Sequence, residues 1–512
     1  MRCAPPALCL LLAALTPVQS GCRSAPSPGS GIVKVDEDGD GRTDLWRSAD
    51  PGGPADVRAP VPGSDPPRTV VLAIDAIPYG LFADLQREGR FRAFFPASRL
   101  VAPFPSLTNL GFSAILRTPP PRGYEDLYFD TERDAFVGGA WDRLTGEYKE
   151  IAPFHEAFDW EEPRLWGAFV FYLPDRVREA ELVRIEEILM GHARGMPDPV
   201  GEKDSELLLY LGSTDAIGHV GGREALREHL LRVDEILERF LAAGGGRDRV
   251  VLLSDHGTSD TPSRLFDLEA ALGRAGFRVA ATGKEPRDVV APAYGLVGSI
   301  QLYTSSGQEE AVARAVVAQD GADFAVWLAT PRPGVSDFAV RAVDAAGSPD
   351  PLDRPADAYP MLRERVRRAF DGATLNPADV LVSLEDGWHY GSPLFDRLVE
   401  IRGTHGSARA SSSVGFLASN VDRTPAWIAA EDALPWLGLE ERSSILREQD
   451  PHTVSNRISS SAPHASAHRP MRDTVGLASA RSAWLTACWL IPSRPARSAW
   501  VSPDRSRASR SR

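Results

Sequence analysis

Three short segments combine Asp, His and Gly in patterns that could bind metal ions. Residues 215–219 (Asp-Ala-Ile-Gly-His) place a carboxylate and an imidazole four positions apart, on one face of a helical turn. Residues 254–257 (Ser-Asp-His-Gly) place the two ligand types side by side, and residues 403–406 (Gly-Thr-His-Gly) supply another imidazole. Carboxylates and imidazoles are ligands that zinc-like ions take in proteins, so these segments predict a metal centre.

Three aspartates, Asp75, Asp215 and Asp255, each follow a run of apolar residues. Such continuous runs are typical of strands buried on both faces of a parallel sheet. The carboxyl ends of parallel strands meet at one edge, where ligands bind. The runs and the aspartates that follow them are 69–74 with Asp75, 206–211 with Asp215, and 249–253 with Asp255. With His219, His256 and His405 they make three Asp and three His, a ligand set for two metal ions.

The order of these elements predicts an α/β fold built on a doubly wound, mostly parallel sheet. Helical patterns over residues 175–190 and 223–241 separate the strand-like runs. Residues from about 260 to 400 mix strand-like and helix-like pieces, which predicts an inserted, smaller α+β subdomain. A strand over 414–418 and a helix over 427–437 are expected to complete the fold.

A threonine at a predicted helix start is the candidate nucleophile. Residues 104–108 (Phe-Pro-Ser-Leu-Thr) lead into a helical stretch over 109–116. Free N–H groups at that helix start would favour a bound phosphate. A threonine hydroxyl is a poor nucleophile at neutral pH, but metal coordination can activate it. Thr108 is therefore a candidate catalytic residue; the alternative is that it only caps the helix, which Thr does well.

Taken together, these motifs resemble those of the alkaline phosphatase superfamily, specifically its type I phosphodiesterase/nucleotide pyrophosphatase branch. The resemblance extends over about residues 68–440 and rests on the strand before Asp75, Pro-Ser-x-Thr, Asp-x-x-Gly-His, Ser-Asp-His-Gly and Thr-His-Gly. It implies an alkaline phosphatase-like catalytic domain over residues 67–441 and two divalent metal ions, zinc in type. In that family pattern Asp75, Thr108, Asp255 and His256 hold one ion, and Asp215, His219 and His405 hold the other.

The same resemblance implies hydrolysis of phosphodiester or pyrophosphate bonds through Thr108 and a covalent phosphothreonine. Three alternatives stay open: a phosphomonoesterase of the same superfamily, a phospho-headgroup transferase, and a non-catalytic metal-binding lipoprotein. The nucleophile segment is not Cys/Ser-x-Pro-x-Arg, which disfavours a sulfatase. Three departures concern the substrate: residues 122–128 lack the Asn usual in nucleotide pyrophosphatases, Thr258 replaces Met, and Arg223 replaces Pro.

The first 22 residues are typical of a bacterial signal peptide. Arg2 precedes an apolar run over 7–15, and small residues precede Cys22. Ordinary cleavage after Val-Gln-Ser and lipidation of Cys22 both fit this pattern. We therefore expect an exported protein, either periplasmic or an outer-membrane lipoprotein. Residues 23–66, rich in Pro, Gly, Ser and Asp, are expected to be a tether.

An acidic loop inside this tether has the spacing of a calcium site. Asp36, Asp38, Asp40 and Asp44 alternate with other residues around two glycines, so their carboxylates could converge on one hard cation such as Ca²⁺. Position twelve of an EF-hand loop would be Arg47 in place of Glu, so the segment is not an EF-hand. The alternative is a solvated acidic turn.

Composition limits the class of partner. The 512 residues include 43% hydrophobic and 25% charged residues, as in an ordinary globular protein. A net charge of -13 argues against nucleic-acid binding by phosphate neutralisation, so we expect a small phosphate-ester substrate. Membrane attachment is expected only through the lipid at Cys22. Residues 442–512, rich in Ser and Arg, predict a disordered tail, or the product of a mis-set reading frame.

Overall fold

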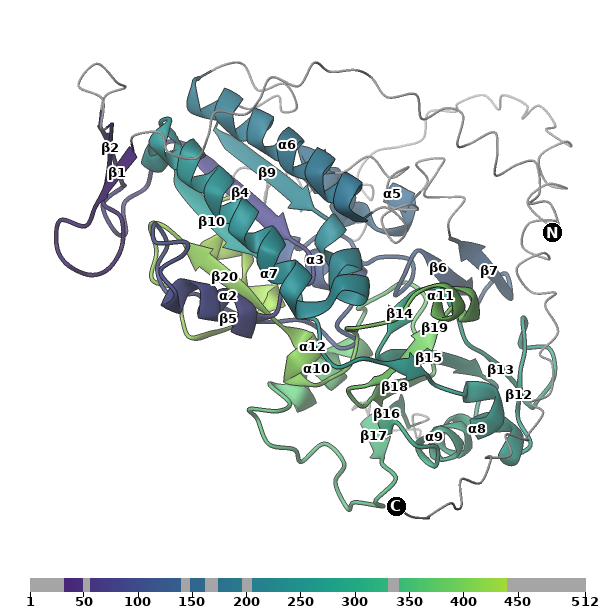
Figure 1. The fold of residues 1–512 in the computed structure, drawn as a ribbon. Helices are drawn as coiled ribbons and strands as arrows, with labels where there is room; N and C mark the ends of the chain where they lie inside the picture. The colour runs from purple at the N-terminus through teal and green to yellow at the C-terminus, as the bar shows by residue number, and fades with distance from the viewer. Residues whose placement is uncertain are drawn as a thin grey trace, which may run out of the picture. The chain divides into compact units, whose positions relative to one another are not determined.

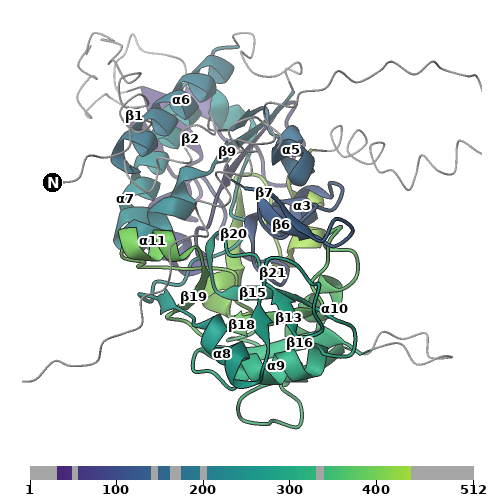
Figure 2. The same cartoon turned by 90° about the vertical axis from the view of Figure 1, so that its right-hand side faces the viewer.

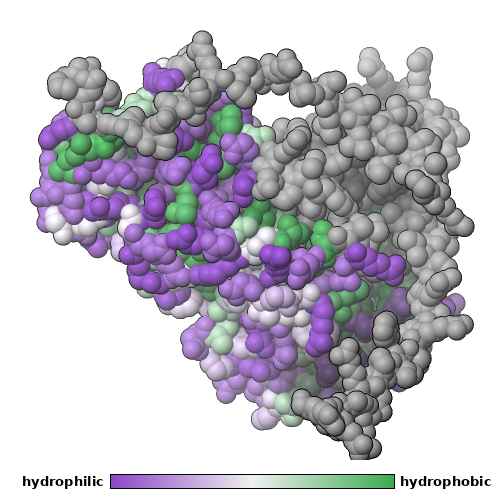
Figure 3. All heavy atoms as spheres, in the orientation of Figure 1, coloured by the Kyte–Doolittle hydropathy of each residue, from purple (hydrophilic) through white to green (hydrophobic). Residues whose placement is uncertain are grey.

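The computed structural model describes residues 32–48, 56–139, 148–161, 174–195, 205–329 and 340–439. The chain divides into two units, Met1–Ser455 and Asn456–Arg512, and every described residue lies in the first. The predicted signal peptide, Cys22 and the tail 442–512 lie outside the described residues. Among the described helices, none combines the length and the apolar character that a membrane span needs. Among the described residues that are coloured in Figure 3, hydrophobic side chains on this face lie in small, separate areas.

A seven-stranded sheet forms the centre of the first unit (Figure 1). Its order is β21-β5-β20-β10-β4-β9-β8, and only β20 runs against the others. The predicted mostly parallel, doubly wound sheet is therefore confirmed. The strands are β4 (Thr69–Ile74), β5 (Ser98–Val101), β8 (Trp160–Glu161), β9 (Glu206–Leu211), β10 (Arg249–Leu253), β20 (Val414–Ser419) and β21 (Trp427–Ala429).

Helices cover both faces of this sheet because its central strands are apolar on both sides. In β4, Val70, Leu72 and Ile74 pack into one core cluster, while Val71 and Ala73 pack into the other. The first face carries α2 (Tyr79–Arg87), α6 (Pro174–Ala193) and α7 (Ser213–Ala242), followed by η2 (Gly245–Arg247). The second face carries α3 (Thr108–Leu116), η1 (Pro153–Ala157), η3 (Ala430–Asp432) and η4 (Leu434–Trp436), with α5 (Tyr148–Ile151) beside η1.

The described residues between 264 and 398, which lie between β10 and β20 in the chain, form the inserted subdomain, seen below the central sheet in Figure 2. A six-stranded sheet has the order β12-β13-β15-β18-β16-β17, and a three-stranded sheet the order β11-β19-β14. One face of the larger sheet packs on α8 and α9, and the other packs on α10 and on the segment before α3. This agrees with the α+β insertion expected from the sequence.

The elements of the insertion are β11 (Arg264–Leu265), α8 (Leu268–Arg274), β12 (Arg278–Val279), β13 (Asp288–Val290), β14 (Leu296–Val297), β15 (Ser299–Thr304), α9 (Glu309–Val317), β16 (Ala322–Leu328), β17 (Val340–Val343), α10 (Leu362–Ala369), β18 (Val380–Leu384), β19 (Trp388–Gly391) and α11 (Pro393–Leu398). The short helix α12 (Ala410–Ser413) leads into β20. A separate hairpin joins β6 (Leu127–Asp130) and β7 (Ala135–Gly138).

Two sequence-based expectations differ from the structure. The helix expected over 427–437 is wrong: this stretch forms β21 and two 3-10 turns, because Trp427–Ala429 pairs with the edge strand β5. The tether expected over 23–66 contains an ordered sheet of β1 (Ile32–Val35), β2 (Leu45–Ser48) and β3 (Val57–Arg58). Trp46 fixes this sheet to the domain, since its ring is buried in the main core and its Nε1 donates to Glu238 on α7 (3.3 Å).

Candidate functional site

The carboxyl ends of three parallel strands bring the predicted aspartates to one edge of the sheet. Asp75 directly follows β4, and its N–H donates to the Leu211 carbonyl at the end of β9 (3.0 Å). Asp255 lies two residues beyond β10, which pairs in parallel with β4. Asp215 lies in the first turn of α7, so His219 projects from the next turn toward the same edge. The strand rule therefore placed the three carboxylates correctly.

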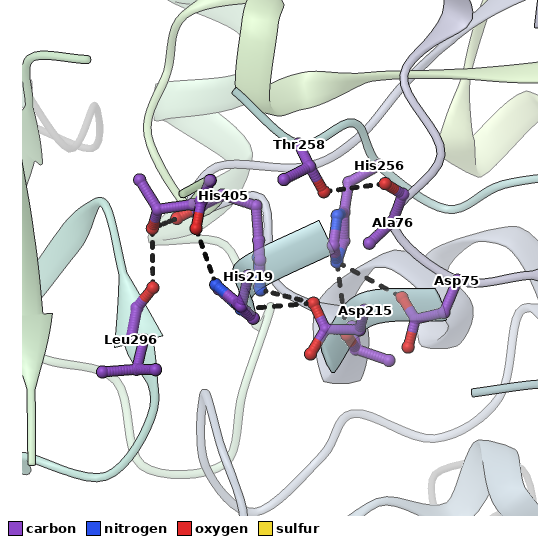
Figure 4. A network of polar contacts seen from close by, with 12 residues as sticks. Asp75, Ala76, Asp215, His219, His256, Thr258, Leu296 and His405 are labelled. Carbon is purple, nitrogen blue, oxygen red and sulfur yellow. Dashed lines mark hydrogen bonds and ion pairs between the residues drawn. The ribbon is translucent and has the colours of Figure 1, made fainter. Parts of the chain in front are cut away.

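Six of the predicted residues form two adjoining groups, and Figure 4 labels five of them, all except Asp255. In the first group, His256 Nε2 lies 3.3 Å from Asp255 Oδ2 and 3.7 Å from Asp75 Oδ1. In the second group, His219 Nε2 and His405 Nε2 lie 3.3 and 3.1 Å from Asp215 Oδ1. The rings of His256 and His405 stack with centroids 4.2 Å apart, so the groups touch.

Thr108 is the first residue of α3 and faces the first group. Its Oγ1 lies 3.2 Å from His256 Nε2. The residue in the N-cap position is Leu107, and no side chain caps this helix end. The hydroxyl of Thr108 therefore faces the acidic cluster and does not serve as the helix cap, the alternative role considered for it.

The three histidines are held with the same ring nitrogen directed at the cluster. Nδ1 of His219 lies 2.9 Å from the Gly403 carbonyl, and Nδ1 of His256 lies 3.0 Å from the Gly257 carbonyl. His405 Nδ1 lies 3.1 Å from the Ser106 carbonyl. A carbonyl oxygen only accepts, so each Nδ1 carries a hydrogen and each Nε2 is the ring nitrogen left to bind a metal ion.

Hydrogen bonds also select one oxygen of each buried carboxylate in the first group. The Tyr210 hydroxyl donates to Asp75 Oδ2 (2.5 Å), and the Ala76 N–H donates to Asp255 Oδ1 (3.4 Å). The other oxygens, Asp75 Oδ1 and Asp255 Oδ2, are buried and receive no hydrogen bond from the described residues. Buried acceptors of this kind are costly unless a cation or donor satisfies them.

The electrostatics of the first group call for a cation. Burial raises the pKa of Asp255 to about 7. Burial, together with the neighbouring carboxylates of Asp255 and Asp215, raises the pKa of Asp75 well above its usual value. Burial and the nearby His405 hold the pKa of His256 well below its usual value, so this imidazole is neutral and able to coordinate. Two buried carboxylates this close ionise together only when positive charge is nearby.

In the second group the carboxylate and the imidazoles compensate one another. Burial by itself would raise the pKa of Asp215, but His219 and His405 outweigh it and hold that pKa well below the usual value. Burial would lower the pKa of His219, but the Asp215 carboxylate outweighs it and raises that pKa. A metal ion entering this group would therefore displace a proton. The unsatisfied oxygens and the lone pairs of the Nε2 atoms together fit two divalent ions with N and O ligands.

The predicted calcium loop is only partly assembled. Carboxylate oxygens of Asp36, Asp38 and Asp40 lie within 4.8 Å of one another. The carboxylate of Asp44 is not in that group and accepts the Glu37 N–H (2.8 Å). Both oxygens of Asp36 already accept loop N–H groups, from Gly39 and Gly41. Calcium binding at this loop stays a prediction.

The structure thus gathers three Asp, three His and Thr108 at the carboxyl edge of the sheet, which is the arrangement that the sequence resemblance implied. A family model described as type I phosphodiesterase/nucleotide pyrophosphatase matches residues 135–408, which is more than half of the chain. The chain therefore belongs to the type I phosphodiesterase/nucleotide pyrophosphatase family. This membership supports hydrolysis of phosphate esters. The match includes Asp215, Asp255 and His405, while Asp75 and Thr108 precede it.

Several solved structures are similar to this chain. Human ectonucleotide pyrophosphatase/phosphodiesterase 5 is 12% identical with a TM-score of 0.43, and 78% of this chain and 97% of that chain are covered. Phosphonoacetate hydrolase from Sinorhizobium meliloti 1021, in complex with phosphonoformate, is 13% identical with a TM-score of 0.45, and the covered shares are 74% and 96%. The curated protein sequences contain no match.

Two residues that contact the site were not singled out from the sequence. Tyr210 belongs to the apolar run of β9, where an aromatic residue reads as core. Ser106 belongs to the segment before Thr108, and its carbonyl accepts a hydrogen bond from Nδ1 of His405, which lies far away in the sequence. The position of Tyr210 offered a signal. It is the second-last residue of β9, so it lies near the carboxyl end of the strand, where the cluster is. The contact of Ser106 depends on tertiary structure and left no local signal.

Proposed function

We propose that this protein hydrolyses phosphodiester or pyrophosphate bonds with Thr108 as the nucleophile and two bound divalent ions, zinc in type. The observation that carries the proposal is the Thr108 hydroxyl 3.2 Å from His256, beside two adjoining groups of carboxylates and imidazoles. Family membership supports the reaction class. Export to the periplasm or outer membrane, with Cys22 as the lipid site, belongs to the proposal and rests on sequence alone.

The residues divide between the two ions as the family pattern implies. Asp75, Thr108, Asp255 and His256 would hold one ion, and Asp215, His219 and His405 the other. When bound, such ions stabilise the charge on the attacking and leaving oxygens and lower the pKa of a hydroxyl. Ser106, Gly257 and Gly403 keep the imidazoles in the tautomer that this ligation needs.

The chain itself supplies the nucleophile and the phosphate contacts. Thr108 gives its hydroxyl proton to water, and its Oγ1 forms a bond to phosphorus as the bond to the leaving oxygen breaks. The leaving oxygen takes a proton from water. The first N–H groups of α3 have no helical acceptor and can donate to the phosphoryl oxygens. Water then attacks phosphorus as the bond to Thr108 Oγ1 breaks. A phosphate monoester is released, because the second ester group stays on phosphorus, and one proton of that water restores the Thr108 hydroxyl.

The test is replacement of the nucleophile. Thr108→Ala should lower the hydrolysis of bis(p-nitrophenyl) phosphate at least about a thousandfold, as expected for loss of a nucleophile. Two ions should still bind, because the carboxylates and imidazoles are unchanged. Thr108→Ser keeps a hydroxyl and is the matched control, expected to retain measurable turnover. Wild-type turnover in Thr108→Ala would refute the role.

The same assay separates the alternatives. A higher kcat/KM for p-nitrophenyl phosphate than for the diester would identify a phosphomonoesterase. Two bound ions without hydrolysis of either ester, in the wild-type protein, would favour a binding protein. Release of a headgroup only in the presence of an alcohol acceptor would indicate a transferase.

A further inference from the structure

A buried arginine of the inserted subdomain contacts the two loops that carry Thr108 and His405. Arg365 lies on α10 and is 4% exposed. Its Nη1 donates to the Ala408 carbonyl (2.9 Å) and to the Pro360 carbonyl (3.3 Å), and its Nη2 donates to the Pro103 carbonyl (3.2 Å). Pro103 lies five residues before Thr108, and Ala408 lies three residues after His405. One guanidinium therefore spans both loops.

The two loops also contact each other directly, at Ser106. The backbones of Ser106 and Gly406 form an isolated antiparallel bridge. The Ser106 hydroxyl donates to the Ser407 carbonyl (2.8 Å) and accepts the Gly406 N–H (3.1 Å). His405 Nδ1 donates to the Ser106 carbonyl. Any change in the spacing of these loops therefore moves Thr108 relative to His405.

The surroundings of Arg365 make its position costly. Within the described part of the chain, no carboxylate lies within 4 Å of its guanidinium, and its acceptors are backbone carbonyls. The core cluster next to it includes Phe104 and Leu107 from the nucleophile segment. Burial lowers the pKa of Arg365 to about 9, which leaves it charged at neutral pH. A buried cation without an anionic partner is destabilising, so a hydrophobic residue would be expected here if packing were the only requirement.

The other arginines of α10 show the contrast. Arg363 pairs with Asp350, Arg367 lies 3.8 Å from Asp371, and Arg368 pairs with Glu364 and Glu431, so each of these arginines has a carboxylate partner. Arg365 instead presents its planar fork to two acceptors from different loops. A lysine ammonium is a point charge and cannot reproduce that bidentate geometry.

We propose that Arg365 is a positioning residue through which the inserted subdomain sets the distance between the nucleophile loop and the His405 loop. Its effect on turnover rests on the proposed function; the clamp itself does not. Because Thr108 contacts the first group through His256 and His405 belongs to the second, the clamp fixes the nucleophile relative to the second group. Displacements of about 1 Å at such a site cost about a hundredfold in rate.

The experiment compares Arg365→Met and Arg365→Lys with the wild type, with Arg367→Met as the matched control on the exposed side of the same helix (side chain 65% exposed). Amide hydrogen exchange is measured in peptides covering residues 101–110 and 402–410. Zinc affinity and the kcat and KM for bis(p-nitrophenyl) phosphate are measured on the same samples. In Arg365→Met we expect faster exchange in both peptides and about 10- to 100-fold losses in kcat and in zinc affinity. KM should change less than about threefold, because the loss affects the chemical step.

The outcomes separate this proposal from the proposed function. If the wild type hydrolyses no ester, the function fails, while faster exchange in both peptides of Arg365→Met still supports the clamp. Exchange and zinc affinity equal to wild type in that variant would overturn it. If Arg365→Met does not fold, Arg365→Lys decides: reduced kcat with faster exchange in one or both peptides supports the clamp, and wild-type values in both measurements overturn it. Arg367→Met should match the wild type throughout.

Discussion

Tyr210 and three backbone carbonyls orient the side chains of the candidate metal centre. The carbonyls fix the tautomer of each histidine, and the Tyr210 hydroxyl occupies one oxygen of Asp75 so that the other faces His256. Such outer contacts determine how well a first shell of ligands is preorganised. We therefore predict that metal affinity depends on the Tyr210 hydroxyl and the three carbonyls, although they are not candidate ligands themselves.

Tyr210→Phe tests this directly. Removing the hydroxyl leaves Asp75 free to rotate, so zinc affinity of the first group should fall about 10- to 100-fold, measured by competition with a chelator. Tyr390→Phe is the matched control, since Tyr390 is equally buried (8%) and its hydroxyl contacts the Ala291 carbonyl in the insertion. Equal zinc affinity in the two variants would contradict the role of Tyr210.

Local sequence rules identified most of the candidate site but not its support. Asp75 and Asp255 follow buried strands, and His219 lies one helical turn after Asp215, so position alone predicted them. His405 follows no such rule; it was included as the imidazole of the Gly-Thr-His-Gly segment, and the family resemblance then supported it. The contacts of Ser106, Tyr210 and Arg365 join segments far apart in the chain, so no local pattern could reveal them.

At the scale of elements, helix α3 packs Gly111 against Asp255, one of the candidate metal ligands. A Cβ added at Gly111 would lie 3.0 Å from both Cβ and Oδ2 of Asp255. Asp255 Oδ2 is the buried oxygen without a described donor. The absence of a side chain at this helix position therefore lets the nucleophile helix approach the carboxylate.

Gly111→Ala should consequently weaken metal binding, although Gly to Ala inside a helix usually stabilises by about 1 kcal/mol. The added methyl group must displace Asp255 or α3, so we expect lower zinc affinity and lower kcat. Gly191→Ala in α6 is the control, because no atom lies within 4 Å of its Cβ position. It should keep both properties and match or raise the Tm; a Gly111→Ala protein with unchanged affinity would refute the packing argument.

Helices and strands could be predicted from the sequence where burial produces a clear pattern of apolar residues. The central strands β4, β9 and β10 and the helices α6 and α7 appear where the sequence indicated them. Residues 427–437 were misjudged because an apolar stretch at a sheet edge satisfies a helical spacing equally well. This stretch forms a strand because it pairs with β5, and such a non-local contact cannot be read from the local sequence.

At the scale of the whole described unit, buried charge links metal content to stability. Without metal, burial raises the pKa of Asp255 to about 7 and also raises that of Asp75. A raised folded-state pKa means that the protonated carboxyls favour the fold, and that stability is lost as pH rises through about 7. The raised pKa of His219 acts in the same direction, and the lowered pKa of His256 acts against it only below about 6.5.

Chelation should therefore destabilise the protein more at pH 8 than at pH 6.5. Bound divalent ions offset the repulsion of the ionised carboxylates, and binding itself stabilises the native state by mass action. The measurement is the difference in Tm between zinc-loaded and chelator-treated protein at the two pH values. A larger difference at pH 6.5 would show that these carboxylates do not govern the linkage.

The order of the candidate ligands along the chain has a consequence for biosynthesis. Asp75, Thr108, Asp215, His219, Asp255 and His256 all precede the insertion, and only His405 follows it. A nascent chain that ends within the insertion contains all candidate ligands for one cation, but for the other it still lacks His405. If His405 completes the second set of ligands, full occupancy of that position would require that translation has passed residue 405.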